Sequence, residues 1–338
     1  MSTVLVTGAA GNLGRRVTSA LCELPYVERV VAVDVARLAS APGVEVHEFD
    51  LGAPGAQEEL AALGKQTDAI LHLAWRPEGD DNLRVMRNVL DAAGAIEPAQ
   101  FVHISSATVY GAWADNPLPI TEEVAPRPNP SLAYAVQKRS AEVMVEKWAE
   151  EHPGTSVALL RPACTVGAVD QPLYEALAAS PRRPLGTERV VQYLHLDDLA
   201  NAVVHSFEQG LAGIYNVAPD AGIREEMAGA LAGGPALLPM FAAVRAGSSN
   251  RRWNWRRHGV LPGAQPYAEH SWVVSGDKLK TTGWKPEYNS EQALVVSDSR
   301  EHWEDMPQGR RVSLVLGGAA ATVVAVGAGG AAWWRHRH

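Results

Sequence analysis

The sequence has few cysteines, no excess of positive charge and no leader-like start, and each absence excludes a class of protein. Its two cysteines, Cys22 and Cys164, suit neither a disulfide framework nor a metal site. The default compartment is therefore a reducing cytoplasm. A formal net charge of −8 argues against a partner such as nucleic acid. The opening letters, MSTVLVTGAAG, lack the basic and hydrophobic regions of a signal peptide.

What the chain does contain is typical of a globular protein. Of its 338 residues, 46% are hydrophobic and 20% charged, which is enough apolar material for a buried core. The length allows one large α/β domain or two modest ones. Neither an internal repeat nor a low-complexity linker interrupts it.

Short β-branched runs alternate with helical spacing through the first half. Alternating strands and helices predict a parallel sheet covered by helices on both faces. The expected strands are Thr3–Thr7, Arg29–Val33, Val44–Glu48, Ala69–Leu73, Phe101–Ser105 and Val157–Leu160. The expected helices are Leu13–Leu24, Gln57–Leu63, Asn82–Ala93 and Ala133–Glu150.

After Cys164 the pattern loosens and Pro and Gly become frequent. One strand followed by a helix returns in VVQYLHLDDLANAVVHSFEQ. We therefore expect a first domain over residues 1–163, to which 189–220 return, and a smaller irregular lobe over 164–188 and 221–305.

A glycine motif, TGAAGNLG, follows the first expected strand and opens the first expected helix. Gly8 and Gly11 would let the backbone approach a pyrophosphate, and Gly14 would let the helix pack closely. The helix start at Asn12 and Leu13 offers a positive dipole end. A glycine turn alone is weak evidence, but the strand–turn–helix context favours a dinucleotide site in a Rossmann-like, doubly wound α/β fold.

An acid ends the second expected strand, at Asp34. A carboxylate there accepts hydrogen bonds from a ribose 2′-hydroxyl and repels a 2′-phosphate, which favours NAD over NADP. Arg15, Arg16 and Arg37 are nearby and leave NADP as the alternative. Further cofactor contacts are expected where the third and fourth strands end, at Asp50, Leu51, Leu73 and Ala74.

Tyr134 and Lys138 lie four residues apart in an expected helix, and therefore on one face of it. An ammonium group near a phenol lowers the phenol's pKa, so that the tyrosine can exchange a proton with a reacting oxygen. Such pairs are common by chance. The segment HISSATVYG adds a hydroxyl, Ser106, at the end of the fifth strand, and Thr108 is a second hydroxyl and a candidate substrate contact.

The sequence resembles the extended short-chain dehydrogenase/reductase family, the NAD-dependent epimerase/dehydratases. The matching stretches are VTGAAGNLG, HLA, HISSATVYG, YAVQK, LLRPACTVG, YLHLDDLANAV, GIYNVA and LKTTGWKPEYNSEQAL. The resemblance implies that Ser106, Tyr134 and Lys138 are catalytic, that Lys138 also holds the nicotinamide ribose, and that Pro162 lies beside the nicotinamide. It also implies that His195, Asp197 and Asp198 are structural, so that no metal is expected.

The expected substrate is a small molecule. SSATVYG is closest to the sugar 4-epimerases, because the Asp–Glu pair of the 4,6-dehydratases is replaced by Ala107 and Thr108. The nucleotide-sugar members place an arginine where this chain has Val191, and Arg189 is two residues too early. Arg189 is therefore only a candidate substrate residue.

Three functions remain open. The first is an epimerase or oxidoreductase acting on a carbinol or carbonyl carbon of a nucleotide sugar or related sugar. The second is an alcohol dehydrogenase or ketone reductase for a lipid-like or steroid-like substrate, which the displaced arginine and an apolar tail favour. The third is a non-catalytic NAD-binding regulatory protein.

The tail from Val312 to Trp334 contains no charged residue. As a helix its 23 residues would span about 35 Å, enough for a bilayer core of about 30 Å. The sequence therefore predicts a C-terminal anchor that leaves the catalytic domain at the cytoplasmic face of a membrane. Small residues recurring every four positions allow a homodimer. The basic, aromatic stretch Arg251–His258 suits a phosphate, a membrane surface or an ordinary surface loop.

Overall fold

The computed structural model describes residues 1–38, 41–76, 81–167, 172–178, 189–231 and 262–298. Its centre is a seven-stranded sheet in the order β10-β6-β5-β4-β1-β2-β3, with every neighbouring pair parallel. The strands are β1 (Ser2–Thr7), β2 (Val27–Asp34), β3 (Val44–Glu48), β4 (Ala69–His72), β5 (Gln100–Ile104), β6 (Ser156–Pro162) and β10 (Gly213–Val217).

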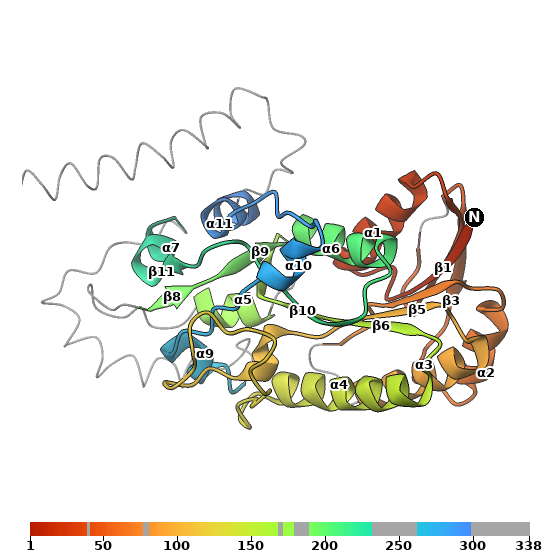
Figure 1. Ribbon diagram of the computed structural model, residues 1–338, viewed down its shortest axis with the longest axis horizontal. Helices are drawn as coiled ribbons and strands as arrows, with labels where there is room; N and C mark the ends of the chain where they lie inside the picture. Colours follow the sequence, from red (N-terminus) through yellow and green to blue (C-terminus); the bar gives the residue numbers. More distant parts are fainter. Residues whose placement is uncertain (39–40, 77–80, 168–171, 179–188, 232–261, 299–338) are drawn as a thin grey trace, which may run out of the picture.

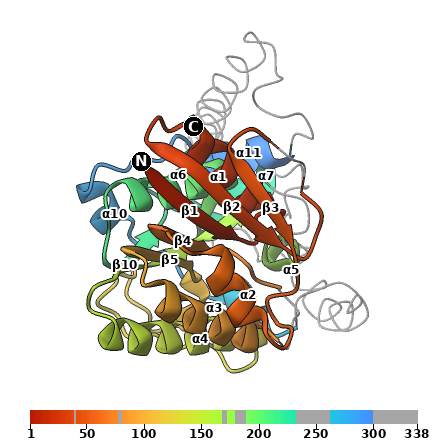
Figure 2. The same cartoon turned by 90° about the vertical axis from the view of Figure 1, so that its right-hand side faces the viewer.

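Helices cover both faces of this sheet, as Figures 1 and 2 show. One layer contains α1 (Asn12–Glu23) and α6 (Leu196–Glu208); the other contains α2 (Ala56–Leu63), α3 (Asn82–Ile96) and α4 (Ala133–Glu151). Side chains alternate along each strand, so Val4 and Val6 enter one buried cluster while Leu5 enters the other. Two hydrophobic cores, one on each face, explain why the strands are apolar almost throughout.

The α/β fold and its parallel sheet are confirmed, and the ten expected elements of the first half form within a few residues of their expected ends. The sequence prediction did not include β10 among its strands, although it assigned this stretch to the first domain. β10 pairs with β6 from Gly213↔Ala158 to Val217↔Pro162 and completes the sheet. Its five residues include Gly213 and Asn216, which are poor strand formers on their own.

A smaller lobe packs at the carboxyl ends of β6 and β10 (Figure 1). Its strand pairs are β7 (Cys164–Val166) with β9 (Tyr193–His195), and β8 (Val190–Val191) with β11 (Ile223–Arg224). Its helices are α5 (Pro172–Ala178), α7 (Glu225–Leu231), α9 (Gln265–Glu269), α10 (Asp277–Thr281) and α11 (Ser290–Asp298).

The carboxylate of Asp198, near the start of α6, joins the two parts. It accepts hydrogen bonds from the backbone N–H groups of Glu287 (2.7 Å) and Tyr288 (3.1 Å). Burial raises the pKa of Asp198 to about 6. This geometry agrees with the structural role that the family resemblance implies for this residue.

Among the described residues, no helix combines the length and apolarity needed to cross a membrane. The predicted anchor Val312–Trp334 and the basic stretch Arg251–His258 both lie outside the described residues.

Candidate functional site

A groove follows the carboxyl edge of the sheet where the chain order reverses between β1 and β4, the point at which open α/β sheets bind ligands. It collects the ends of four strands and the start of α3. Its lining residues are Gly8, Ala10, Gly11, Asp34, Val35, Ala36, Phe49, Asp50, Leu51, Leu73, Ala74, Trp75, Arg76, Asp81, Asn82 and Val85. We call it the dinucleotide groove.

The first glycine of the motif is required by its surroundings. Gly8 has a φ of +75°, and a Cβ there would come within 2.5 Å of the backbone nitrogen of Ala74 at the end of β4. At Gly14, a Cβ would lie 2.1 Å from the carbonyl oxygen of Gly8. The two glycines therefore let the loop, the helix and β4 approach closely. Asn12 and Leu13 form the start of α1 directly after Gly11.

Asp34 connects the end of β2 to the glycine loop. One carboxylate oxygen accepts from the backbone N–H of Ala10 (2.9 Å) and the other from that of Ala36 (2.9 Å). The side chain is thus fixed in the wall of the groove. The ribose contact that the sequence predicts for Asp34 stays a prediction.

The far end of the groove holds ion pairs that sequence reasoning missed. Arg76 forms an ion pair with Asp81, with 3.0 Å between Nη1 and Oδ2, and lies 3.7 Å from Asp50. Asp50 additionally accepts from the N–H of Gly52 at 2.9 Å. Arg76 follows directly after the motif HLAW, and its position beyond the strand end was the only available signal.

Ser106 lies just beyond β5 and caps η1 (Ala107–Tyr110). Its hydroxyl oxygen accepts from the backbone N–H of Thr108 (3.2 Å) and from the Thr108 hydroxyl (2.9 Å). Thr108 is fully buried, so its hydroxyl orients Ser106. The substrate contact that the sequence suggested for Thr108 stays a prediction.

Tyr134 and Lys138 lie on one face of α4, as their spacing predicts, and their side chains approach each other. The Lys138 nitrogen lies 5.8 Å from the centre of the Tyr134 ring and donates to the carbonyl of Ile104 at 2.8 Å. Ser106 forms a side-chain hydrogen bond with Tyr134. The structure therefore brings together all three residues that the sequence selected.

The expected effect of Lys138 on the phenol needs correction. Burial raises the pKa of Tyr134 to about 12, and the hydrogen bond with Ser106 opposes this only in part. Burial also lowers the pKa of Lys138 to about 7, although the charge of Glu142 acts in the other direction. Among the protein's own groups, loss of hydration outweighs the attraction between ammonium and phenolate. Tyr134 consequently carries its proton at neutral pH.

Two buried histidines lie beneath these residues, on β4 and β5. The rings of His72 and His103 stack with their centres 5.3 Å apart, and the Thr7 hydroxyl is 2.7 Å from Nδ1 of His72. Burial and the nearby Lys138 charge lower the pKa of both, that of His72 to about 3. Both rings are therefore neutral at physiological pH.

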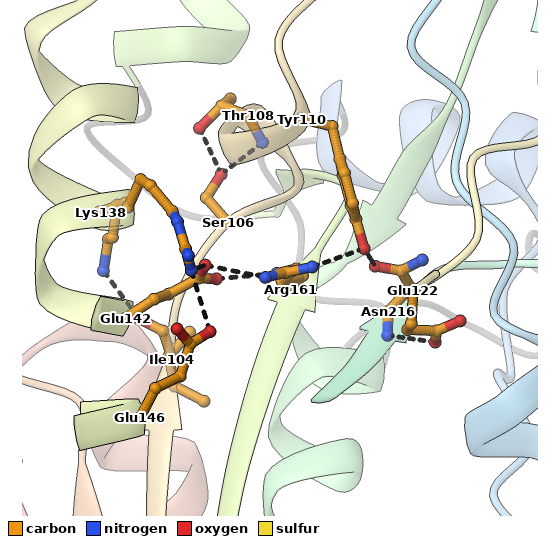
Figure 3. A network of polar contacts seen from close by, with 11 residues as sticks. Ile104, Ser106, Thr108, Tyr110, Glu122, Lys138, Glu142, Glu146, Arg161 and Asn216 are labelled. Carbon is orange, nitrogen blue, oxygen red and sulfur yellow. Dashed lines mark hydrogen bonds and ion pairs between the residues drawn. The ribbon is translucent and has the colours of Figure 1, made fainter. Parts of the chain in front are cut away.

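A buried polar network lies beside Ser106 and Lys138 (Figure 3). Arg161 on β6 donates to both oxygens of Glu142, at 2.8 and 2.9 Å, and to the Tyr110 hydroxyl at 2.9 Å. That hydroxyl donates in turn to Asn216 (2.9 Å). Glu142 is one helical turn after Lys138. The network thus ties α4 to the sheet directly behind the ammonium group.

Two further residues that the sequence selected, Pro162 and Arg189, lie outside the group formed by Ser106, Tyr134 and Lys138. Pro162 ends β6 and is buried. Arg189, the candidate substrate residue, donates to Glu225 at 2.7 Å and to the carbonyl of Tyr267 at 2.5 Å. These partners fix its guanidinium inside the smaller lobe.

The donor set of the dinucleotide groove fits a nicotinamide dinucleotide. The glycine loop and the start of α1 suit a diphosphate, and the Asp34 carboxylate suits ribose hydroxyls. Trp75, in the groove wall, has a buried Nε1–H that finds no acceptor among the described residues. A ligand filling the groove would bring acceptor oxygens to this wall.

A glycine-lined groove at the switch point of a parallel sheet, beside Ser106, Tyr134 and Lys138, is the arrangement of a dinucleotide-binding Rossmann fold. The model of the NAD dependent epimerase/dehydratase family matches residues 4–218, which is more than half of the chain. The chain therefore belongs to this NAD-dependent family, as the resemblance predicted.

The chain is also similar to individual curated proteins. It is 27% identical over 317 residues to an uncharacterised protein of Mycobacterium tuberculosis, covering 86% of this chain and 82% of that one. It is 28% identical over 301 residues to the GDP-6-deoxy-D-mannose reductase of Pseudomonas aeruginosa, covering 76% and 86%. Another curated relative is longer, and the match spans 56% of its length.

Solved structures of the same fold include a UDP-glucose 4-epimerase of Thermus thermophilus in complex with NAD. It has a TM-score of 0.64 at 21% sequence identity, with 88% of this chain and 97% of that chain covered. At this identity the likeness shows the fold alone.

Proposed function

We propose that the chain is an NAD-dependent oxidoreductase or epimerase that acts on a carbinol or carbonyl carbon of a nucleotide sugar or a related sugar. The observation that carries this proposal is the convergence of Ser106, Tyr134 and Lys138 at the carboxyl edge of the sheet, beside the dinucleotide groove. The Pseudomonas reductase and the Thermus epimerase, by their names, act on nucleotide sugars.

In this proposal each residue has a separate task. Tyr134, protonated at neutral pH, donates its proton to a carbonyl oxygen or receives one from a hydroxyl. Ser106 hydrogen-bonds the same oxygen and is oriented by Thr108. Lys138 would hold the hydroxyls of the nicotinamide ribose. Bound NAD would supply the hydride acceptor and a positive charge near the phenol.

Cofactor choice gives a direct test at Asp34. Replacing it in Asp34→Ala removes the charge that would repel a 2′-phosphate, so we expect the preference for NAD over NADP to fall by roughly tenfold. Calorimetric titration with both cofactors measures this ratio. Asp34→Asn is the matched control, because it removes the charge but keeps an oxygen for the N–H of Ala10. A wild-type protein that prefers NADP would show this assignment to be wrong.

The substrate can be tested by thermal shift. If the site takes nucleotide sugars, UDP- or GDP-sugars raise the melting temperature of the NAD-loaded protein. NAD that co-purifies with the protein supports an epimerase, which regenerates its cofactor in each cycle. Freely exchanging NAD supports a net oxidoreductase.

One observation favours a second candidate, a ketone reductase or alcohol dehydrogenase for an apolar substrate. Arg189 is fixed by Glu225 and by backbone carbonyls. A guanidinium held by these partners is not placed to clamp the diphosphate of a nucleotide sugar. Stabilisation by a steroid or lipid ketone, with none from nucleotide sugars, would decide for this candidate.

We also propose that Val312–Trp334, outside the described residues, anchors the protein to a membrane. After carbonate washing, the full chain should remain with membranes, whereas a chain ending at Gly309 should be released and still bind NAD. The physical reason is the length of the uncharged segment relative to a bilayer core. Recovery of the full chain wholly in the supernatant would contradict the anchor.

A further inference from the structure

We propose that Trp75 is a positioning residue, whose indole ring holds the Lys138 ammonium group through a cation–π contact and shields it from water. The Lys138 nitrogen lies 3.7 Å from the centre of the Trp75 ring. The same indole meets the ring of Tyr134 edge-on, with the centres 6.3 Å apart and an interplanar angle of 88°. Trp75 therefore contacts two of the three catalytic residues.

The contact with Trp75 limits how many N–H donors of the Lys138 ammonium group can bind a ligand. An ammonium group has three N–H donors. One donates to the carbonyl of Ile104 at 2.8 Å, and the face of Trp75 covers another side. The side chain of Lys138 is almost completely buried, at 3% exposed. The third N–H can then donate to a hydroxyl group of a bound ligand. This step rests on the proposed function, in which that hydroxyl belongs to the cofactor.

The loop that carries Trp75 is tied to the helix that carries Lys138. The side chain of Asn82 accepts from the backbone N–H of Arg76 (2.9 Å) and donates to its carbonyl (2.7 Å). It also donates to the side chain of Gln137 at 3.0 Å. Because Gln137 immediately precedes Lys138, these bonds hold the indole and the ammonium group in register.

The groups around Lys138 show why the Trp75 ring affects its protonation. Four titratable groups face it: His72 from β4, His103 from β5, and Tyr134 and Glu142 from α4 itself. Both histidines and the phenol are neutral at pH 7, so Glu142 is the one negative charge among them. A ring face stabilises the ammonium form without exchanging a proton. Removing the ring should therefore make Lys138 easier to deprotonate.

Lysine NMR tests this without any substrate. In protein labelled with ¹³C at the lysine ε-carbon, with the Lys138 signal assigned by its loss in Lys138→Arg, we expect ring-current-shifted ε-protons in the wild type. In Trp75→Leu this shift should disappear, and the pKa of Lys138 should fall by roughly one unit. Affinity for NAD, measured by calorimetry at pH 7.5, should weaken roughly five- to tenfold. Trp75→Phe keeps a ring face and should retain most of each property.

Trp113→Leu is the matched control, because Trp113 carries a different cation, Arg127, 4.8 Å from its ring centre. It should leave the Lys138 signal unchanged. Melting curves establish folding, and Trp75→Met replaces the leucine variant if that does not fold. An unchanged Lys138 pKa and shift in a folded Trp75→Leu protein would overturn the proposal. Absence of NAD binding in the wild type would instead contradict the proposed function and leave the Lys138 titration readable.

Discussion

Tyr134→Phe should lose turnover by roughly two to four orders of magnitude while keeping its fold and its affinity for NAD, since this is the usual worth of a general acid–base group. Only the phenolic oxygen is removed, and the ring stays in place against Trp75. Turnover is measured with the nucleotide sugar or ketone that most raises the melting temperature, and NAD affinity by calorimetry.

Tyr215→Phe is the control, because its hydroxyl donates to the carbonyl of Ala212 at 3.2 Å on the edge strand β10. That variant should keep near-normal turnover. The burial of Tyr134 adds a pH signature: its high pKa keeps the phenol protonated across the physiological range, so proton donation should not decline until the pH is strongly alkaline. Near-normal activity of Tyr134→Phe at pH 7 would remove Tyr134 from the mechanism.

The sequence could predict the site's main residues because each belongs to a local pattern. Gly8 and Gly14 occur at fixed spacing after a strand, and the structure shows the backbone contacts that exclude a Cβ at both. Tyr134 and Lys138 share a helix face by spacing alone. The parallel sheet followed from alternating elements, each recognisable within a dozen residues.

What the sequence could not predict depends on contacts between distant segments. Burial lowers the pKa of Lys138, and Trp75, whose ring faces its ammonium group, lies 63 positions earlier in the chain. The spacing of two residues predicts that they are neighbours, but it does not predict how far burial removes water from them. The expected lowering of the Tyr134 pKa was therefore wrong in direction. The partners of Arg189 are likewise distant, with Tyr267 supplying a carbonyl from another part of the lobe.

Substitutions in the buried ion pair of Arg161 and Glu142 should cause a large loss of unfolding free energy. Their side chains are 1% and 0% exposed. Breaking such a pair from one side leaves an uncompensated buried charge, which typically costs about 3–5 kcal/mol of unfolding free energy. We expect Glu142→Leu to lie at the upper end of that range, because a guanidinium cannot lose its proton.

Arg161→Met should cost less than Glu142→Leu. The carboxyl group left behind can take up a proton, and Arg139 still donates to it at 3.1 Å. In this variant protonation of the carboxyl group removes a buried charge that has lost its main partner, so the deficit relative to wild type should shrink as the pH falls from 7 to 5. The double replacement should recover much of the loss, because an apolar pair leaves no charge to compensate. Urea unfolding of the four proteins at both pH values measures these differences, and equal costs for the two single variants at pH 5 would contradict the argument.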